Sequence, residues 1–428
     1  MAYRKFRADQ LFTGHEMAAE DAVLIIREDG LVEAVLPAGE AGEDVESLRG
    51  ILSPGFINCH CHLELSHMKG VIPEGTGLVD FLLNVIRGRG AAGASGAVQD
   101  AGQSPGGRVA GEGGRVVGAD ELLERKLAAI AAAEAEMLQG GIVAVGDICN
   151  TSDSLEQKKG GNLLYHNFIE TMGFAEQGAA DRFGSSLRVF QAFAEAYPLP
   201  IAANSIVPHA PYSVSARLFG LIAGFPGNQL LTIHNQEDEA ENVFCLSGRG
   251  DFLRLYGALG LDVSFFRGTG KRSLESWLPH FYPGQSLILV HNVATSEEDL
   301  RFARGWKHLF FCLCPNANLY ISGRLPDPDL LMRYDCQVVL GTDSLASNHR
   351  LSILEEIKTL QRKFPLLPTA TLLQWATLNG ARALQLDGVL GSFSPGKQPG
   401  VLLIEDEEGG ESEKERKIGS LAAVRRLI

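Results

Sequence analysis

Residues 51–62 read ILSPGFINCHCH, a short apolar run that ends in two histidines separated by one residue. Seven further runs of the same kind follow, each ending in polar or ionisable residues. They are IVAVGDICN (142–150), LLYHNFIET (163–171), IAANSIVPHA (201–210), LLTIHNQE (230–237), SLILVHN (286–292), HLFFCLCP (308–315) and QVVLGTDS (337–344). Nearly continuous apolar runs are typical of strands buried on both faces, as in a parallel sheet.

Helical patterns fill the intervals between these runs. The segment 119–141, ADELLERKLAAIAAAEAEMLQGG, is rich in strong helix formers and stops at a glycine pair. SILEEIKTLQRKF (352–364) and TATLLQWATLNGARAL (369–384) show helical patterns as well. Eight strands that alternate with helices over roughly 300 residues predict the α/β class, as a (β/α)8 TIM barrel spanning 51–390.

The two ends of the chain share a different pattern. Residues 1–50 contain short alternating runs, and the Asp29-Gly30 pair between two of them predicts a hairpin. Residues 391–428 contain two similar apolar runs with an acidic stretch between them. We therefore expect one small β-sandwich domain built from both termini, 1–50 and 391–428.

One segment breaks the barrel pattern. Residues 88–118 contain 11 glycines in 31 residues and no aromatic residue. Such a composition buries too little apolar surface to order itself, so it predicts a flexible Gly-rich insertion in the barrel.

The composition narrows the classes of partner and compartment. The 428 residues carry 38 basic and 52 acidic side chains, a net charge of −14. A nucleic-acid or anionic-membrane partner would favour a basic face, so we expect neither and predict a small-molecule substrate. The seven cysteines lie mostly within apolar runs, and no stretch has the length of a signal peptide or membrane span. These features predict a cytoplasmic protein.

Ionisable residues gather at the predicted strand ends. Five of the eight strands end in histidine or aspartate: His60 and His62, His209, His234, His291, and Asp343. In a barrel these carboxyl ends converge on one face, where active sites are built. Side chains two apart on a strand share a face, so both histidines of the first strand can reach one ion. With His234 and Asp343 they offer three nitrogens and one oxygen, a set that suits zinc or ferrous iron.

These motifs resemble the amidohydrolase superfamily. PGFINCHCH, IHNQE, LVHN and LGTDS are similar to its cytosine deaminase-like, triazine hydrolase and adenosylhomocysteine deaminase branch. PHAPYSVS (208–215), CPNANLYISGRLPD (314–327) and PGKQPGVLLIE (395–405) add to the resemblance, which spans nearly the whole chain. The loops HLELSH and GTDSLASN are also similar to those of aminodeoxyfutalosine and related nucleoside deaminases.

The resemblance implies a role for each matching residue. His60, His62, His234 and Asp343 would be the metal ligands, and Asp343 would also accept a proton. Glu237 would shuttle a proton to a ring nitrogen. His291 would hydrogen-bond the attacking water or polarise the substrate.

The same resemblance bears on the metal and the assembly. Two-metal relatives carry a carboxylated lysine on the fourth strand, and SIVPHAPYS has none. One divalent metal per chain is therefore implied, with zinc ahead of iron. Family members often dimerise, so the resemblance allows a homodimer.

Further residues on the active-face loops are candidates for substrate binding. They are His209, Glu64, Asn318, Arg324 and Ser344. For Glu64 a loop salt bridge is the alternative, and for Arg324 plain exposure to solvent.

Together these observations predict a metal-dependent hydrolase of non-peptide C–N bonds in cyclic amidines. The leading expectation is an aminohydrolase (deaminase) that uses metal-activated water on a purine- or pyrimidine-like ring or nucleoside. Hydrolysis of a cyclic amide or a triazine-type substituent is the alternative within enzymes. A non-catalytic barrel scaffold is the alternative from another class.

Overall fold

A computed structural model describes residues 2–91, 119–196, 203–406 and 417–428. The predicted insertion at 88–118 lies almost wholly outside these ranges, so its flexibility stays a prediction. Only its first four residues are described, as the end of helix α1 (Leu78–Ala91).

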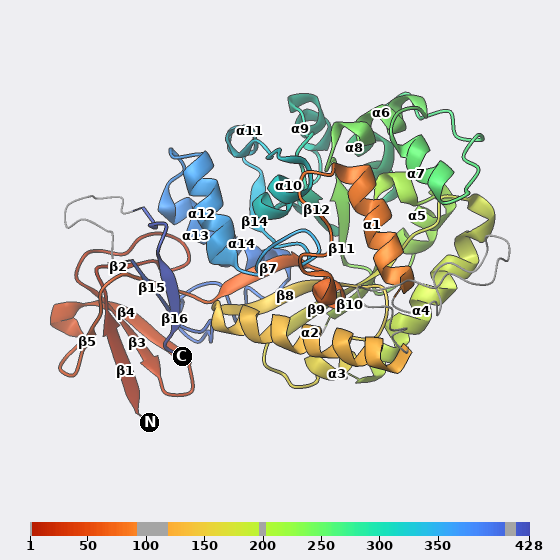
Figure 1. Cartoon of the computed structure of the whole chain (residues 1–428). Helices are drawn as coiled ribbons and strands as arrows, with labels where there is room; N and C mark the ends of the chain where they lie inside the picture. Colours follow the sequence, from red (N-terminus) through yellow and green to blue (C-terminus); the bar gives the residue numbers. More distant parts are fainter. Residues whose placement is uncertain (1, 92–118, 197–202, 407–416) are drawn as a thin grey trace.

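The eight predicted barrel strands are all present, in the predicted order (Figure 1). Their bounds are β7 (Phe56–Cys61), β8 (Ile142–Cys149), β9 (Leu164–Thr171), β10 (Ala203–Pro208), β11 (Leu230–Asn235), β12 (Ser286–His291), β13 (Leu309–Leu313) and β14 (Gln337–Leu340). They form two parallel four-stranded sheets, ordered β10-β9-β8-β7 and β11-β12-β13-β14. Their residues are almost all buried, as expected for strands covered on both faces.

The two sheets join into a barrel along two seams. At one seam the backbone N–H groups of Thr342 and Asp343 donate to the carbonyl oxygen of His60, at 3.0 and 3.1 Å. At the other, the N–H of His234 donates to the carbonyl oxygen of His209 at 3.0 Å. A side chain at Gly341 would bring its Cβ within 2.8 Å of the His60 Cβ, so this close approach requires glycine. Both seams therefore close at the strand ends that carry the predicted site.

Helices cover the outside of the barrel, and short helices lie in the segments above its carboxyl end (Figure 1). They are α1, α2 (Ala119–Gln139), α3 (Leu155–Lys158), α4 (Ala179–Ala196), α5 (Ala216–Ala223), α6 (Glu239–Ser247), α7 (Phe252–Ala258), α8 (Ser273–Trp277), α9 (Glu297–Ala303), α10 (Pro315–Ser322), α11 (Pro328–Arg333), α12 (Ile353–Lys363), α13 (Thr369–Ala376) and α14 (Leu378–Ala383). The predicted helix at 119–141 ends at the expected glycine pair, where Gly141 adopts a positive φ of 82°.

The termini build two further sheets beside the barrel, as expected (Figure 1). One has the order β4-β3-β1-β5 and the other β16-β15-β6-β2. Their strands are β1 (Tyr3–Arg7), β2 (Gln10–Leu11), β3 (Ala22–Arg27), β4 (Val32–Pro37), β5 (Glu46–Ser47), β6 (Ile51–Ser53), β15 (Leu402–Glu405) and β16 (Ala423–Arg426). The predicted hairpin at Asp29-Gly30 joins β3 to β4.

One predicted strand is in fact two. The run 51–62 divides at Pro54-Gly55: β6 pairs with β15 in the terminal sheet, and β7 enters the barrel. Proline lacks the N–H that a continuous ladder needs, which explains the break. The domain limits at 50/51 and 390/391 themselves stay a prediction.

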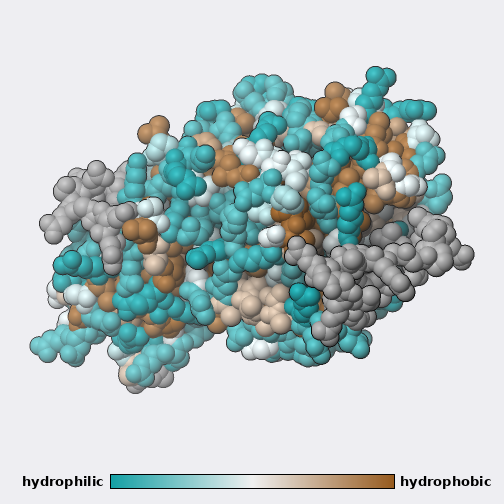
Figure 2. Space-filling view, viewed as in Figure 1, coloured by the Kyte–Doolittle hydropathy of each residue, from teal (hydrophilic) through white to brown (hydrophobic). Residues whose placement is uncertain are grey.

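The face in Figure 2 is largely hydrophilic, with scattered apolar side chains between charged ones. In the described ranges, no helix has both the length and the apolar character needed to cross a bilayer.

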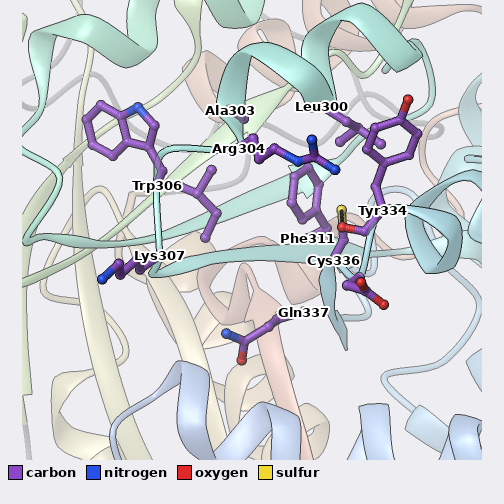
Figure 3. A pocket seen from close by; sticks show the side chains of 11 residues that line it. Leu300, Ala303, Arg304, Trp306, Lys307, Phe311, Tyr334, Cys336 and Gln337 are labelled. Atoms are coloured by element: carbon purple, nitrogen blue, oxygen red, sulfur yellow. Dashed lines mark hydrogen bonds between the residues drawn. The ribbon is translucent and has the colours of Figure 1, made fainter.

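A cavity of about 160 Å³ lies at the opposite end of the barrel from the predicted site (Figure 3). Its lining includes Leu309 and Gln337, the first residues of β13 and β14, with Trp306 and Tyr334 at its sides. Active sites of such barrels lie at the carboxyl ends of the strands, so this cavity is not the candidate site.

Candidate metal centre and active site

The centre of the carboxyl face holds a compact cluster of three histidines. His60 and His62 come from the end of β7, and His234 comes from β11. One side-chain nitrogen of each lies within 4.8 Å of the others, and the three side chains are buried. Nε2 of His62 and Nε2 of His234 are 3.3 Å apart. This is the arrangement that the sequence spacing predicted.

Asp343 completes the cluster from the loop after β14. Its Oδ1 lies 3.6 Å from Nε2 of His60 and 3.4 Å from Nε2 of His62. Its Oδ2 accepts a hydrogen bond from Ser347 Oγ at 2.6 Å, which fixes the carboxylate. Burial would raise the pKa of Asp343, but the surrounding imidazoles of His60, His62 and His291 lower it overall.

The separations of the ligand atoms and the lack of hydrogen-bond partners for the His60 nitrogens fit one metal ion. A tetrahedral zinc bound at about 2.0–2.1 Å from each donor would leave neighbouring donors about 3.3 Å apart. The measured separations of 3.3 to 3.6 Å agree with that value. Both ring nitrogens of His60 are buried with no hydrogen-bond partner within the described ranges, which an ion would relieve.

Burial favours the neutral form of two of the clustered imidazoles, His62 and His234. It is the largest cause of the lowered pKa of both His62 and His234. His234 donates from Nδ1 to the carbonyl oxygen of His209 at 2.8 Å, which leaves its Nε2 lone pair facing the cluster. A neutral imidazole oriented by its second nitrogen is the form that binds a metal.

Two buried titratable side chains lie beside the cluster. Glu237 follows β11 and is buried, with Oε1 3.5 Å from Nε2 of His291 at the end of β12. Burial, followed by the charge of Asp343, raises the pKa of Glu237 well above its usual value. Burial lowers the pKa of His291 to about 4, so this imidazole is neutral near pH 7. An acid with a raised pKa beside a neutral imidazole suits proton transfer at neutral pH.

Backbone strain concentrates at the same strand ends. Four non-glycine residues adopt positive φ there: Gln236 (48°), His291 (78°), Asn292 (59°) and Asp343 (56°). Such conformations cost free energy and persist where the surroundings impose them, commonly at functional sites.

The predicted substrate residues divide into two groups. His209, Asn318 and Ser344 lie at the site: the His209 ring is 4.9 Å from the His234 ring, Asn318 hydrogen-bonds His291, and Ser344 is buried next to Asp343. Arg324 lies on the exposed loop after α10, and its side chain forms no hydrogen bond or ion pair within the described part of the chain. The solvent alternative fits its position.

Glu64 faces the loop after β8. Its Oε2 accepts from the N–H groups of Asn150 and Thr151 and from Thr151 Oγ1, each at 3.1 Å. Its Oε1 is 3.6 Å from Nη2 of Arg89. These contacts fit the alternative of a loop salt bridge. The binding of substrate by Glu64 stays a prediction.

Three residues at the site were not anticipated. Glu170 ends β9, Asn150 follows β8, and Arg89 lies near the end of α1. Asn150 links them, because it accepts from Arg89 and donates to Oε2 of Glu170 at 2.8 Å. A search of strand ends for every carboxylate, rather than for histidine and aspartate, would have found Glu170.

Known proteins resemble this chain in sequence and in fold. The family described as "Amidohydrolase family" matches residues 265–418. An adenosine deaminase of Helicobacter pylori is 27% identical over 345 residues, covering 79% of this chain and 75% of that protein. A structure of aminofutalosine deaminase from the same organism, in complex with methylthio-coformycin, has a TM-score of 0.74 at 21% identity, covering 95% and 93% of the two chains. A zinc-bound adenosine deaminase from Xanthomonas campestris has a TM-score of 0.65 at 21% identity, covering 94% and 85%.

Fold and site together define a barrel enzyme with a buried metal-binding cluster at the carboxyl ends of its strands. The chain belongs to the amidohydrolase superfamily, and it is a hydrolase of carbon–nitrogen bonds other than peptide bonds.

Proposed function

We propose that the protein is a zinc-dependent deaminase that releases ammonia from the purine ring of a nucleoside. The observation that carries the proposal is the Glu237–His291 pair, 3.5 Å apart, beside the ligand cluster. The similarity to adenosine and aminofutalosine deaminases supports a purine nucleoside as the substrate.

His60, His62, His234 and Asp343 would hold one ion, and the zinc-bound Xanthomonas campestris relative supports zinc. When bound, zinc supplies hydroxide near neutral pH by lowering the pKa of water from 15.7 to about 7. Buried imidazole nitrogens without hydrogen-bond partners are destabilising unless they bind something. A non-catalytic scaffold would gain nothing from them, so the cluster favours the enzyme over the scaffold alternative.

The remaining steps belong to the side chains of this chain. Glu237, which keeps its proton because burial raises its pKa, donates that proton to the ring nitrogen next to the reacting carbon. His291 donates a hydrogen bond from Nε2 to the attacking oxygen, and Asp343 accepts a proton from it. Asp343 passes the proton that it took from the attacking oxygen to the amine, which leaves as ammonia. The ring carbon keeps the oxygen as a carbonyl, and Glu237 regains a proton from solvent.

An ammonia-release assay tests the proposal. Zinc-loaded protein would be screened against adenosine, 5′-methylthioadenosine, guanine, pterins and an amino-substituted triazine. We expect ammonia from one or more adenine nucleosides, in a one-to-one ratio with the inosine-type product. Ammonia from the triazine alone, or none from any nucleoside, would contradict the proposal. Protein stripped with a chelator, and the same protein with zinc restored, are the matched controls.

A further inference from the structure

Glu170 presents an unused carboxylate oxygen to the site. Its side chain is 2% exposed, and Asn150 holds Oε2 with a hydrogen bond of 2.8 Å. Oε1 is buried and has no hydrogen-bond partner among the described residues. A buried carboxylate oxygen without a donor costs free energy, so a donor that arrives with the substrate would be bound favourably.

Among the described residues, neither of the two neighbouring imidazoles donates to Oε1 of Glu170. Nδ1 of His234 is 3.7 Å from Glu170 Oε1, but its proton already goes to the carbonyl oxygen of His209. On His209, Nδ1 is paired with Ser213 Oγ at 2.7 Å. Within the described ranges, Oε1 of Glu170 therefore has no hydrogen-bond donor.

A second metal ion is a weak candidate for this position. Glu170, His209 and His234 do form a group with one ligand atom each within 4.8 Å. His234, however, also belongs to the first cluster, and its Nδ1 is already used as a donor. It has one lone pair to give, so the second group would keep only two ligands.

The position of Glu170 indicates which part of the substrate it meets. Glu237, His291 and Asp343 come from β11, β12 and β14, in one sheet of the barrel. Glu170 lies at the end of β9 and His209 follows β10, in the other sheet. Tyr212, three residues beyond His209, also has a buried hydroxyl with no partner in the described ranges. The groups proposed for proton transfer thus come from one sheet of the barrel, and the buried polar groups without partners come from the other.

We propose that Glu170 is a specificity-determining residue that accepts a hydrogen bond from a sugar hydroxyl of the substrate. The inference rests on the proposed deaminase function and names the substrate class more closely. The site takes a nucleoside with its 2′- or 3′-hydroxyl present, in preference to a bare ring or a ring that carries alkyl groups. An alkyl group against Glu170 would leave the carboxylate oxygen buried and unpaired.

Binding without turnover tests this directly. The probes are purine riboside, which has no amine to lose, and its 2′,3′-dideoxy analogue, each titrated calorimetrically into zinc-loaded protein. Hydrogen bonds to a charged group predict that the wild type binds the riboside about 10- to 100-fold more tightly. Glu170→Ala should reduce that ratio to below about 3-fold and leave the affinity for the dideoxy analogue unchanged. Glu170→Gln, which keeps the shape and loses the charge, should fall between the two.

Glu134→Gln is the matched control, because Glu134 is equally buried but lies on α2 and bonds Gln157, Asn162 and Tyr165. Its ratio should equal that of the wild type. Equal affinity of the wild type for both probes, binding of neither, or an unchanged ratio in Glu170→Ala would overturn the inference. Loss of a second equivalent of zinc in Glu170→Ala would also overturn it.

The two proposals fail separately. Wild-type protein that discriminates between the probes but releases no ammonia from any nucleoside would contradict the deaminase function and support the role of Glu170. Equal kcat/KM for adenosine and 2′,3′-dideoxyadenosine would leave the deaminase function standing and overturn the role of Glu170.

Discussion

The side-chain amide of Asn318 donates to Nδ1 of His291 at 3.1 Å. An imidazole that accepts at Nδ1 carries its proton on Nε2, and this Nε2 points toward Glu237. Asn318 therefore selects the tautomer of His291 that can donate a hydrogen bond into the site.

Replacement of Asn318 by alanine should remove this hydrogen bond, so that His291 is no longer held in the tautomer with its proton on Nε2. We expect kcat to fall by about 10- to 100-fold with little change in KM, as for the loss of a group that orients a catalytic side chain. Steady-state kinetics of ammonia release measure both constants. The control is Arg324→Ala, because Arg324 is exposed on the neighbouring loop. Normal kinetics in Asn318→Ala, or equal losses in both variants, would contradict the assignment.

Glu237→Gln should keep its metal and lose most of its turnover. The amide has nearly the same shape but cannot supply a proton, and general acid–base catalysis contributes about 10²- to 10⁴-fold. Zinc content and kcat would be measured on the same preparation. Glu239→Gln, two residues away and half exposed, should be indistinguishable from the wild type. A rate within threefold of normal in Glu237→Gln would remove its proton-transfer role.

His234→Ala should abolish metal binding, because it removes one of the clustered imidazoles. We expect about one equivalent of zinc per chain in the wild type and less than about a tenth in the variant, by elemental analysis. His280→Gln is the control, since His280 stacks on Phe219 away from the cluster. Full zinc content in His234→Ala would disprove the ligand assignment.

The buried carboxyl of Glu241 should make stability depend on pH. Burial raises its pKa from 4.5 to about 8, although Ser273 Oγ and the N–H of Gln236 donate to it. The folded protein thus holds this proton more tightly than the unfolded chain does. The stabilisation is complete below about pH 4.5 and is lost as the pH rises through about 8.

Glu241→Gln cannot ionise, so it should flatten this decline. At pH 9 we expect a free energy of unfolding higher than that of the wild type, by an amount on the order of a few kcal/mol. Urea unfolding of zinc-loaded protein at pH 5, 7 and 9 provides the measurement. Glu33→Gln at an exposed position serves as the control. Parallel pH profiles for the wild type and Glu241→Gln would refute the prediction.

Much of this architecture could be predicted because the same short sequence patterns indicate both the barrel strands and the site residues. An apolar run ending in histidine or aspartate, as at His234 and Asp343, marks both a buried strand and its functional end. The side-chain contacts were harder to predict, because they depend on the path that each loop takes after its strand. Nothing in the sequence near Glu64 shows that its carboxylate turns to the loop after β8.

Two other differences have identifiable causes. Arg89 lies within the glycine-rich segment whose composition predicts flexibility. Helix α1 nevertheless extends over the first four residues of that segment, 88–91, and places the Arg89 guanidinium against Asn150. The break at Pro54-Gly55 was visible in the sequence, but the apolar residues on both sides of it concealed the change of sheet.

The two seams of the barrel also divide the proposed metal ligands. The half formed by β7 to β10 supplies His60 and His62, and the half formed by β11 to β14 supplies His234 and Asp343. Neither half of the barrel alone provides all four ligands proposed for the ion. An ion shared between them acts as a cross-link between two fragments of the chain, so its affinity adds to the cohesion of the assembled barrel and not to either fragment. Two polypeptides cut between β10 and β11 would therefore be expected to reassociate more tightly with zinc than without it.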